Sequence, residues 1–185
     1  MLSRNAIIIA LLIVPMVADA QRGGRRRGTE APNYDALVNE DRGEGAVLAK
    51  RDLETMNPTK LLIDKRKALS LTDSQLAQIR DLDAKLATMN DSLFKTLDSL
   101  RTEMRKKNTG LSPQVEAMRK RGIRQGMVDI VQAVRANYNA TSEKAVPVLS
   151  EEQQKTANEM LDKQEKDGDA FIMEKLGGGG GRRGG

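Results

Sequence analysis

Two helix-start signals of the same kind, 78 positions apart, constrain the fold of this chain more than any other feature. The first is Leu71-Thr72-Asp73-Ser74-Gln75-Leu76, and the second is Leu149-Ser150-Glu151-Glu152-Gln153-Gln154. In each, a Thr or Ser hydroxyl caps the helix, and a Gln three residues later reaches back to the N–H of the cap. The first copy also places Leu71 and Leu76 for a hydrophobic staple, which the second lacks. Both copies therefore predict the first turn of a helix.

A long apolar stripe follows the first signal and predicts a helix from Asp73 to Lys107. At 1.5 Å per residue, this helix would be about 50 Å long. Asn108-Thr109-Gly110 ends it, and Gly110 suits a left-handed turn. The stripe repeats at steps of three and four and consists of Leu76, Ile79, Leu82, Leu86, Met89, Leu93, Leu97, Leu100 and Met104.

Three further helices are expected from caps and prolines. Asn57-Pro58 opens a short helix to about Leu69, Ser112-Pro113 begins a long one that Pro147 closes, and the second signal starts a helix from Glu151 towards Leu176. Gly122 and Gly126 would let another backbone approach the third helix closely, and Gly168 would bend or fray the fourth. The expected fold is all-α, with four helices in an ordered domain over residues 57–176.

The two long helices, joined by a short turn, should form an elongated antiparallel hairpin. Aromatic residues make up 2% of the chain, so it has few of the large side chains that fill a globular core. Two shorter helices cannot cover so long a seam, and we therefore expect a homodimer that shares part of its apolar surface.

The first twenty residues have the pattern of an export signal. Arg4 precedes an apolar run from Ala6 to Val14, and Ala18-Asp19-Ala20 is a small-x-small cleavage site. The alternative is a membrane anchor, which is disfavoured because the run is shorter than the roughly 20 residues that span a bilayer. We expect cleavage after Ala20 and a mature protein outside the cytoplasm, without stable membrane insertion.

Gly- and Arg-rich segments flank the expected domain. Residues 21–56 and 177–185 are predicted to be disordered tails, and a short helix over Ala46 to Thr55 is the one element that the first of them allows. Arg-Gly tracts also occur in flexible RNA-binding segments. The export signal and the scarcity of aromatic residues make nucleic acid an unlikely partner here.

Histidine and cysteine are both absent, which removes the usual zinc ligands and the usual nucleophile and base pairs. We therefore expect no enzymatic activity and no cofactor. Methionine thioethers bind soft Cu(I), but the nine methionines are spaced singly, and their helical spacing also fits a core.

Charge is distributed unevenly along the expected domain. Residues 101–124 hold eight basic and two acidic residues, whereas residues 143–175 hold nine acidic residues and five lysines. Two solvated faces would explain this pattern, but methionines interleave with the basic cluster, and flexible thioethers suit loose contact with many partners. The candidate binding residues are Met104, Arg105, Met118, Arg119, Arg121, Ile123, Arg124 and Met127.

The stretch from Leu69 to Arg80, together with Val148 to Lys155, resembles the paired signatures of the Spy/CpxP family of periplasmic stress proteins, with Ser150 where Thr is more usual. The resemblance implies a four-helix, cradle-shaped antiparallel homodimer whose concave face holds unfolded or partly folded proteins, called clients, without ATP. Some relatives bind zinc through histidines, which this chain lacks. Six residues match the motif and are expected to shape the helix junctions: Leu71, Thr72, Gln75, Leu149, Ser150 and Gln153.

These observations favour an ATP-independent periplasmic chaperone that suppresses aggregation under envelope stress, capturing clients first by charge and then by apolar contact. The alternative is a modulator that docks on the periplasmic domain of an envelope-stress sensor kinase. Positive charge at the hairpin fits both functions.

Overall fold

Helices are the regular elements of the part of the chain that the structure, a computed structural model, describes: Tyr34, residues 47–106 and residues 109–176. These residues contain no strand, so the all-α prediction is confirmed for them. They belong to one structural unit, residues 32–185. The predicted export signal and most of the predicted tails lie outside the described residues. The elements are α2 (Lys50–Glu54), α3 (Pro58–Asp64), α4 (Asp73–Met104), α5 (Pro113–Ala145), the 3₁₀-helix η1 (Val146–Val148) and α6 (Glu151–Leu176).

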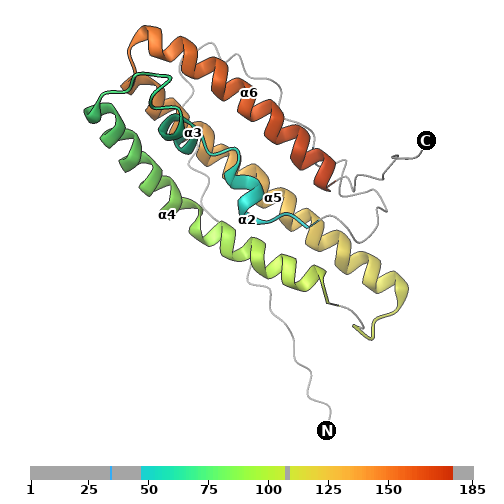
Figure 1. Ribbon diagram of the computed structural model, residues 1–185. Helices are drawn as coiled ribbons and strands as arrows, with labels where there is room; N and C mark the ends of the chain where they lie inside the picture. Colours follow the sequence, from blue (N-terminus) through green and yellow to red (C-terminus); the bar gives the residue numbers. More distant parts are fainter. Residues whose placement is uncertain (1–33, 35–46, 107–108, 177–185) are drawn as a thin grey trace, which may run out of the picture. The chain divides into compact units, whose positions relative to one another are not determined.

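The long helices α4 and α5 form the predicted antiparallel hairpin (Figure 1). Helix α6 runs beside α5, so α5 lies between α4 and α6. The short helices α2 and α3 lie over the space between α4 and α6, where α3 contacts α4, α5 and α6. The hairpin therefore has one end near the two helix-start signals and the other at the α4–α5 turn.

Side-chain caps fix the predicted helix starts. The Asn57 side chain accepts hydrogen bonds from the amides of Thr59 and Lys60 at 2.9 and 3.1 Å, and Pro58 occupies the first position of α3. Ser112 accepts from the amide of Val115 at 3.5 Å before Pro113. Because each cap satisfies amides that have no partner within the helix, the chain enters the helix at that residue.

Helix α3 ends earlier than predicted, at Asp64 rather than Leu69. Residues 65–70 form turns, and the amide of Leu71 bonds to the carbonyl of Arg66 at 2.9 Å, which is the six-to-one bond of a Schellman motif. Ser70 takes the left-handed position of this motif with φ 51°. The chain thus reverses direction immediately before the first helix-start signal.

Two apolar clusters hold the helices together. The smaller cluster surrounds the two helix-start signals and consists of Leu62, Leu69, Ile79, Ala145, Leu149 and Ala157. The larger cluster fills the centre and the far part of the hairpin and consists of Tyr34, Leu48, Leu53, Met56, Leu86, Phe94, Leu97, Ile123, Met127, Val128, Ile130, Val131, Val134, Tyr138, Ile172 and Leu176.

The apolar stripe of α4 differs from the predicted one at its middle. Met89 is 46% exposed, whereas Asn90 is buried and accepts a hydrogen bond from the Asn137 side chain of α5 at 2.7 Å. Phe94 is also buried. The buried side of α4 therefore shifts from Met89 to Asn90, because the side-chain amides of Asn90 and Asn137 pair between the two helices.

The glycines of α5 and α6 also act differently from the prediction. Gly126 makes room for the side chain of Leu100 rather than for a backbone. No atom of the described part of the chain lies within 4 Å of a Cβ built at Gly122. Helix α6 continues through Gly168, which is buried against Met56. Side-chain packing, and not a bend, accounts for Gly168.

The ordered unit begins before residue 57, the predicted start of the domain. Residues 47–56, which we call the N-terminal strap, contain α2 and place Leu48, Leu53 and Met56 in the larger cluster. The predicted disorder over residues 21–56 is therefore wrong for residues 47–56. Helix α2 lies within the range, Ala46 to Thr55, in which the sequence allowed a short helix.

Candidate functional site

The two helix-start signals lie against each other and form one polar junction. Thr72 caps α4, accepting from the amide of Gln75 at 3.2 Å, and the Gln75 side chain accepts from the amide of Thr72 at 3.0 Å. In the second copy, Gln153 accepts from the amide of Ser150 at 2.8 Å, and the Ser150 hydroxyl accepts from the amide of Gln153 at 3.4 Å. Both predicted capping boxes are present.

Each glutamine also reaches across to the other signal. The side-chain amide of Gln75 donates to the side-chain oxygen of Gln153 at 2.8 Å and to the main-chain carbonyl of Val148 at 3.1 Å. The side-chain amide of Gln153 donates to the main-chain carbonyls of Leu69 and Ser70 at 2.9 and 3.1 Å. The arrangement is reciprocal, because each side chain caps its own helix and binds the loop before the other helix.

The leucines of the signals anchor this junction in the smaller apolar cluster. Leu149 is buried at 4% exposure and Leu71 is partly buried against the cluster. The six motif residues therefore join the starts of α4 and α6. Spacing predicted the two boxes separately, but it contained no signal for their direct pairing.

The opposite end of the hairpin has an exposed apolar face. Leu111, Val115 and Met118 are 44%, 47% and 74% exposed. Leu111 precedes Ser112, the N-cap of α5, and Val115 and Met118 lie three positions apart on one side of the first turns of the helix. Within the described residues, nothing lies within 4 Å of a Cβ at Gly122, the next position on this side.

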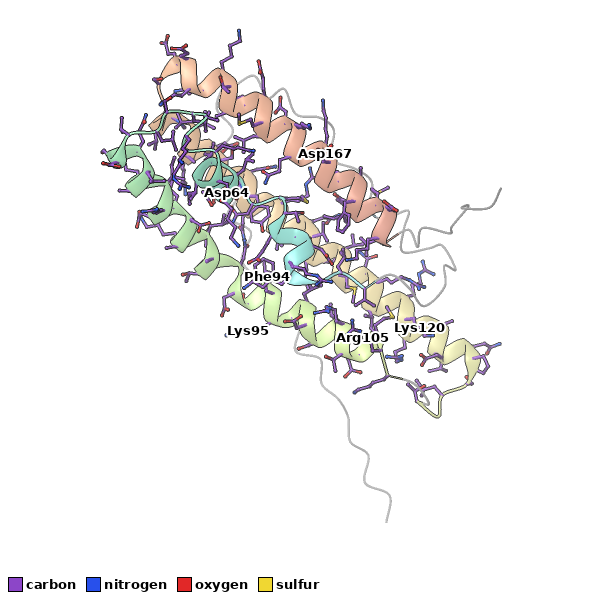
Figure 2. All side chains as sticks on the ribbon, viewed as in Figure 1. Asp64, Phe94, Lys95, Arg105, Lys120 and Asp167 are labelled. Carbon is purple, nitrogen blue, oxygen red and sulfur yellow. The ribbon has the colours of Figure 1, made fainter. Side chains whose placement is uncertain are left out.

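Basic residues lie at the same end of the hairpin as this face. Arg105 and Lys120 lie at this end of the hairpin, one on each arm (Figure 2). Arg105 and Arg121 are exposed, and Lys106 forms an ion pair with Glu103 at 2.6 Å. With two acidic residues among residues 101–124, the end of the hairpin has an excess of positive charge.

Arg119 has a structural position within this basic end. Its guanidinium donates to both oxygens of Glu116, at 2.9 and 2.6 Å, and to the carbonyl of Glu103 in the last turn of α4 at 2.8 Å. The hydrogen bond from Arg119 lowers the pKa of Glu116 to about 2, and Thr109 adds a further hydrogen bond. Arg119 thereby joins the two arms of the hairpin next to the turn.

The remaining candidate binding residues lie at different depths. Met118 and the Arg105 side chain are exposed, Met104 is partly buried, and Ile123 and Met127 are buried in the larger cluster. Arg124 is partly buried, and its Nε is buried without a hydrogen-bond partner among the described residues. The eight residues thus divide into an exposed set and a set that supports the hairpin from within.

A charged network between α5 and α6 was not predicted. Arg135, 7% exposed, forms ion pairs with Glu165 at 2.5 Å and Asp169 at 3.0 Å. The hydroxyl of Tyr34 donates to Asp169 at 2.6 Å, and the Arg135 guanidinium lies 5.9 Å from the centre of the Tyr34 ring. These partners are up to 135 positions apart, so periodicity contained no signal for them.

Burial shifts the pKa values of two groups in this network. It raises the pKa of Asp169, while the hydrogen bond from Tyr34 and the charge of Arg135 act in the opposite direction. Burial and the bond to Asp169 raise the pKa of the Tyr34 hydroxyl, which keeps it a neutral donor. The network therefore holds α5 and α6 together with satisfied charges.

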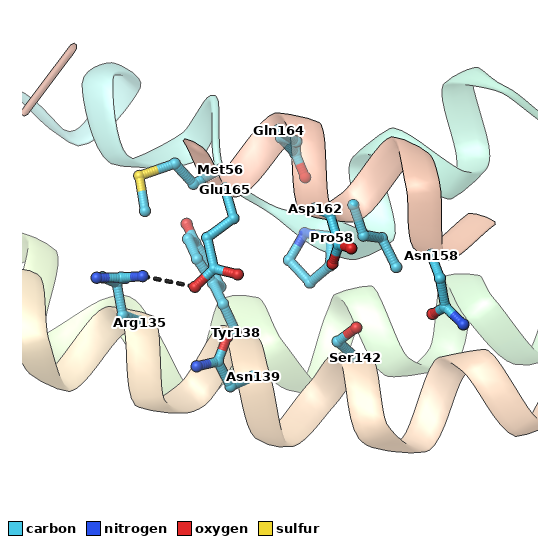
Figure 3. A pocket seen from close by; sticks show the side chains of 11 residues that line it. Met56, Pro58, Arg135, Tyr138, Asn139, Ser142, Asn158, Asp162, Gln164 and Glu165 are labelled. Carbon is cyan, nitrogen blue, oxygen red and sulfur yellow. Dashed lines mark hydrogen bonds and ion pairs between the residues drawn. The ribbon is translucent and has the colours of Figure 1, made fainter. Parts of the chain in front are cut away.

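A pocket opens between α5 and α6 next to this network (Figure 3). Its volume is about 120 Å³. Met56, Pro58, Tyr138 and Leu161 provide apolar walls, and the ion pair between Arg135 and Glu165 lies at one side. The other lining residues are three amides, a serine and a carboxylate, so the pocket has both apolar and polar walls.

The described ranges contain no group of three or more His, Cys, Asp or Glu side chains that could hold a metal ion. In the same ranges, no helix has the length and apolar character needed to cross a membrane.

A family model described as "LTXXQ motif family protein" matches residues 63–161. The matched segment contains both helix-start signals and the whole α4–α5 hairpin, and it ends within α6. The search of curated proteins and the search of solved structures each found no match. The N-terminal strap, Tyr34 and the last turns of α6 lie outside the matched segment.

Proposed function

This chain belongs to the LTXXQ motif family, a non-enzymatic helical family that includes the Spy/CpxP-type periplasmic proteins, and we propose that it is an ATP-independent periplasmic chaperone. Its clients are unfolded or partly folded proteins, and its role is to suppress their aggregation under envelope stress. The observation that carries this proposal is the exposed apolar face of Leu111, Val115 and Met118 within a basic end of the hairpin.

The proposed mechanism has two steps. Positive charge at the hairpin end attracts acidic segments of a client over about one Debye length, roughly 8–10 Å at physiological salt. Exposed apolar side chains then contact the apolar surface that the client has not yet buried. Met118 is suited to this contact because an unbranched thioether side chain adapts to partners of different shape.

The paired helix-start signals and the hydrogen bonds of Arg119 hold the hairpin that carries this surface in a fixed conformation. Gln75 and Gln153 join the starts of α4 and α6 at one end, and Arg119 joins α4 to α5 at the other. A rigid frame with adaptable surface residues allows weak, reversible binding, so that a client can leave or fold while bound.

Light scattering of a chemically denatured client, diluted into buffer with a few-fold excess of the mature protein, tests the proposal. We expect suppression at low salt that weakens as salt is added. The variant Arg105→Glu/Arg121→Glu should lose most of the suppression of aggregation. Lys155→Glu/Lys163→Glu, two exposed residues of α6 with the same change in charge, is the matched control. Absence of suppression by the unmodified protein at low salt would refute the proposal.

We propose further that the protein acts as a homodimer, the arrangement that its resemblance to the Spy/CpxP-type proteins implies. Sedimentation equilibrium tests this, and a purely monomeric protein at micromolar concentration would contradict it. Co-purification with a single sensor kinase, together with no general client binding, would instead support the signalling function.

A further inference from the structure

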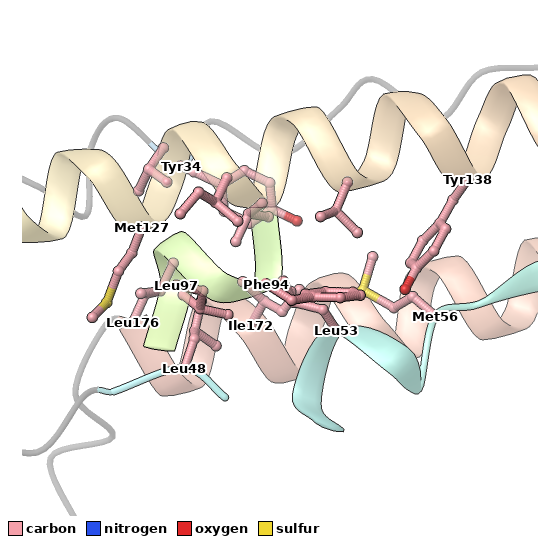
Figure 4. Packing of buried hydrophobic residues seen from close by; sticks show 14 of the residues in the cluster. Tyr34, Leu48, Leu53, Met56, Phe94, Leu97, Met127, Tyr138, Ile172 and Leu176 are labelled. Carbon is pink, nitrogen blue, oxygen red and sulfur yellow. The ribbon is translucent and has the colours of Figure 1, made fainter. Parts of the chain in front are cut away.

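The N-terminal strap lies in a site that has the features of a peptide-binding surface. Its three large buried apolar side chains, Leu48, Leu53 and Met56, are 0%, 1% and 7% exposed. They pack in one cluster with side chains from three helices (Figure 4). We call this surface the strap site, and it consists of Phe94 and Leu97 of α4, Met127 of α5, and Gly168, Ile172 and Leu176 of α6.

Polar groups of α6 bind the strap through features that any peptide has. The side-chain amide of Gln164 donates to the main-chain carbonyls of Thr55 and Asn57, at 2.7 and 3.2 Å. Lys175 forms an ion pair with Asp52 at 2.6 Å. The site therefore recognises main-chain carbonyls, one carboxylate and large aliphatic side chains.

The strap depends on the site for its order. Helix α2 has five residues, and its N-cap is Ala49, which has no side-chain oxygen to accept from the first turn. Isolated helices shorter than about 12–15 residues are marginal in water. The conformation of the strap is thus imposed by its contacts, as is the conformation of a peptide that folds when it binds.

Space for a different side chain exists next to Met56. The pocket of about 120 Å³ begins at Met56 and continues along α5 and α6 past Tyr138 and Leu161. At Gly168, a Cβ would overlap the Cγ of Met56, so the absence of a side chain there creates the place that Met56 occupies. A segment with a longer or branched residue at this position has room to extend into the pocket.

We propose that the strap site binds client segments and that the strap occupies it in cis until a client displaces it. The segments that fit have the chemistry of the strap: large aliphatic side chains at the spacing of Leu48, Leu53 and Met56, with a carboxylate to meet Lys175. This inference rests on the proposed function, because the client supplies the competing segment. The strap lies outside the residues that match the family model.

A reversible cross-link tests whether the strap must leave the strap site before a peptide can bind there. The Cβ of Met56 lies 3.6 Å from the Cβ position of Gly168, within the range of 3.5–4.5 Å that a disulfide requires. The chain contains no other cysteine, so Met56→Cys/Gly168→Cys forms a single defined bond in the full-length protein.

The probe is a fluorescein-labelled peptide of residues 47–57 that carries Met56→Ala, because the side chain introduced by Gly168→Cys would overlap the Cγ of Met56. Its binding is measured by fluorescence anisotropy. We expect the reduced double-cysteine protein to bind it at least tenfold more tightly than the oxidised protein, with recovery on adding reductant. Equal affinity of the two forms would overturn the proposal.

A second pair of variants weakens the strap instead of fixing it. Leu53→Ser should raise the affinity for the peptide at least tenfold over the unmodified protein, because the cis competitor is weaker. Arg51→Ser is the matched control, since the Arg51 side chain is 87% exposed, and it should not change the affinity. The proposal would be overturned if the Leu53→Ser protein is folded by circular dichroism but does not bind the peptide. If this variant unfolds, the comparison of oxidised and reduced Met56→Cys/Gly168→Cys protein is the test of the proposal.

The peptide assay contains no client, so it separates this inference from the proposed function. Failure of aggregation suppression with normal peptide exchange would refute the chaperone function while supporting the site. Suppression that is identical in the oxidised and reduced proteins would refute the strap site while leaving the chaperone function standing.

Discussion

Pairing of the two helix-start signals predicts a measurable coupling between Gln75 and Gln153. Gln75→Ala removes the acceptor for the Thr72 amide and the bonds to Gln153 and Val148. At about 1 kcal/mol for each net hydrogen bond, discounted for partial exposure, the loss is about 2 kcal/mol. Gln153→Ala removes an equivalent set and should cost a similar amount.

The double variant should cost about 3 kcal/mol rather than about 4, because the mutual bond is lost only once and the coupling is about 1 kcal/mol. Thermal and urea unfolding followed by circular dichroism at 222 nm measure this. At about 4 °C for each kcal/mol, each single change lowers Tm by roughly 8 °C.

Gln78→Ala is the matched control for this cycle. Gln78 is exposed one turn further along α4, and its amide lies 3.5 Å from the Ser74 hydroxyl. Its loss should change stability by less than about 0.5 kcal/mol. Additive costs of Gln75→Ala and Gln153→Ala, within about 0.3 kcal/mol, would refute the reciprocal pairing.

Three further predictions follow from single sites. Arg135→Ala leaves the buried carboxylate of Asp169 and the partly buried carboxylate of Glu165 without their cation. It should lower the free energy of unfolding by about 3 kcal/mol in urea titrations, and a loss below about 1 kcal/mol would contradict the buried network. Ser70→Gly relieves a left-handed residue and should raise stability by about 1 kcal/mol in the same titrations, and a decrease would contradict the Schellman turn. NMR titration of Glu116 should give a pKa of about 2, so the stabilisation by its bond to Arg119 is retained at neutral pH and lost as pH falls towards 2; a midpoint near 4.5 would show that the bond does not form.

Local signals in the sequence predicted where the helices begin. Asn57, Thr72 and Ser112 each cap a helix as expected, because capping is an interaction within four residues and depends little on the remainder of the fold. The apolar stripe of α4 was also predictable, apart from the shift at Asn90, because it depends only on the helical spacing of residues within one segment.

Contacts between distant segments were not predictable in this way. Tyr34 bonds to Asp169 across 135 positions, and Leu53 lies in a polar segment whose composition suggested disorder. Met118, Ile123 and Met127 stand in one apolar series in the sequence, yet Ile123 and Met127 are buried and Met118 is exposed. At 3.6 residues per turn, Met118 lies on the side of α5 opposite Met127, so the apolar series changes side and only the packing of neighbours shows where it is covered.

The proposed contact of clients with the hairpin end is tested most directly by site-specific photo-cross-linking. A photoreactive amino acid is placed at Met118 or, as the matched control, at Met89, an exposed methionine of α4 at 46% exposure. Each protein is then mixed with a denatured client and irradiated. Client adducts from position 118 that exceed those from position 89 and decrease with added salt are the predicted result. Equal labelling from both positions, or labelling from position 89 alone, would contradict the proposed surface.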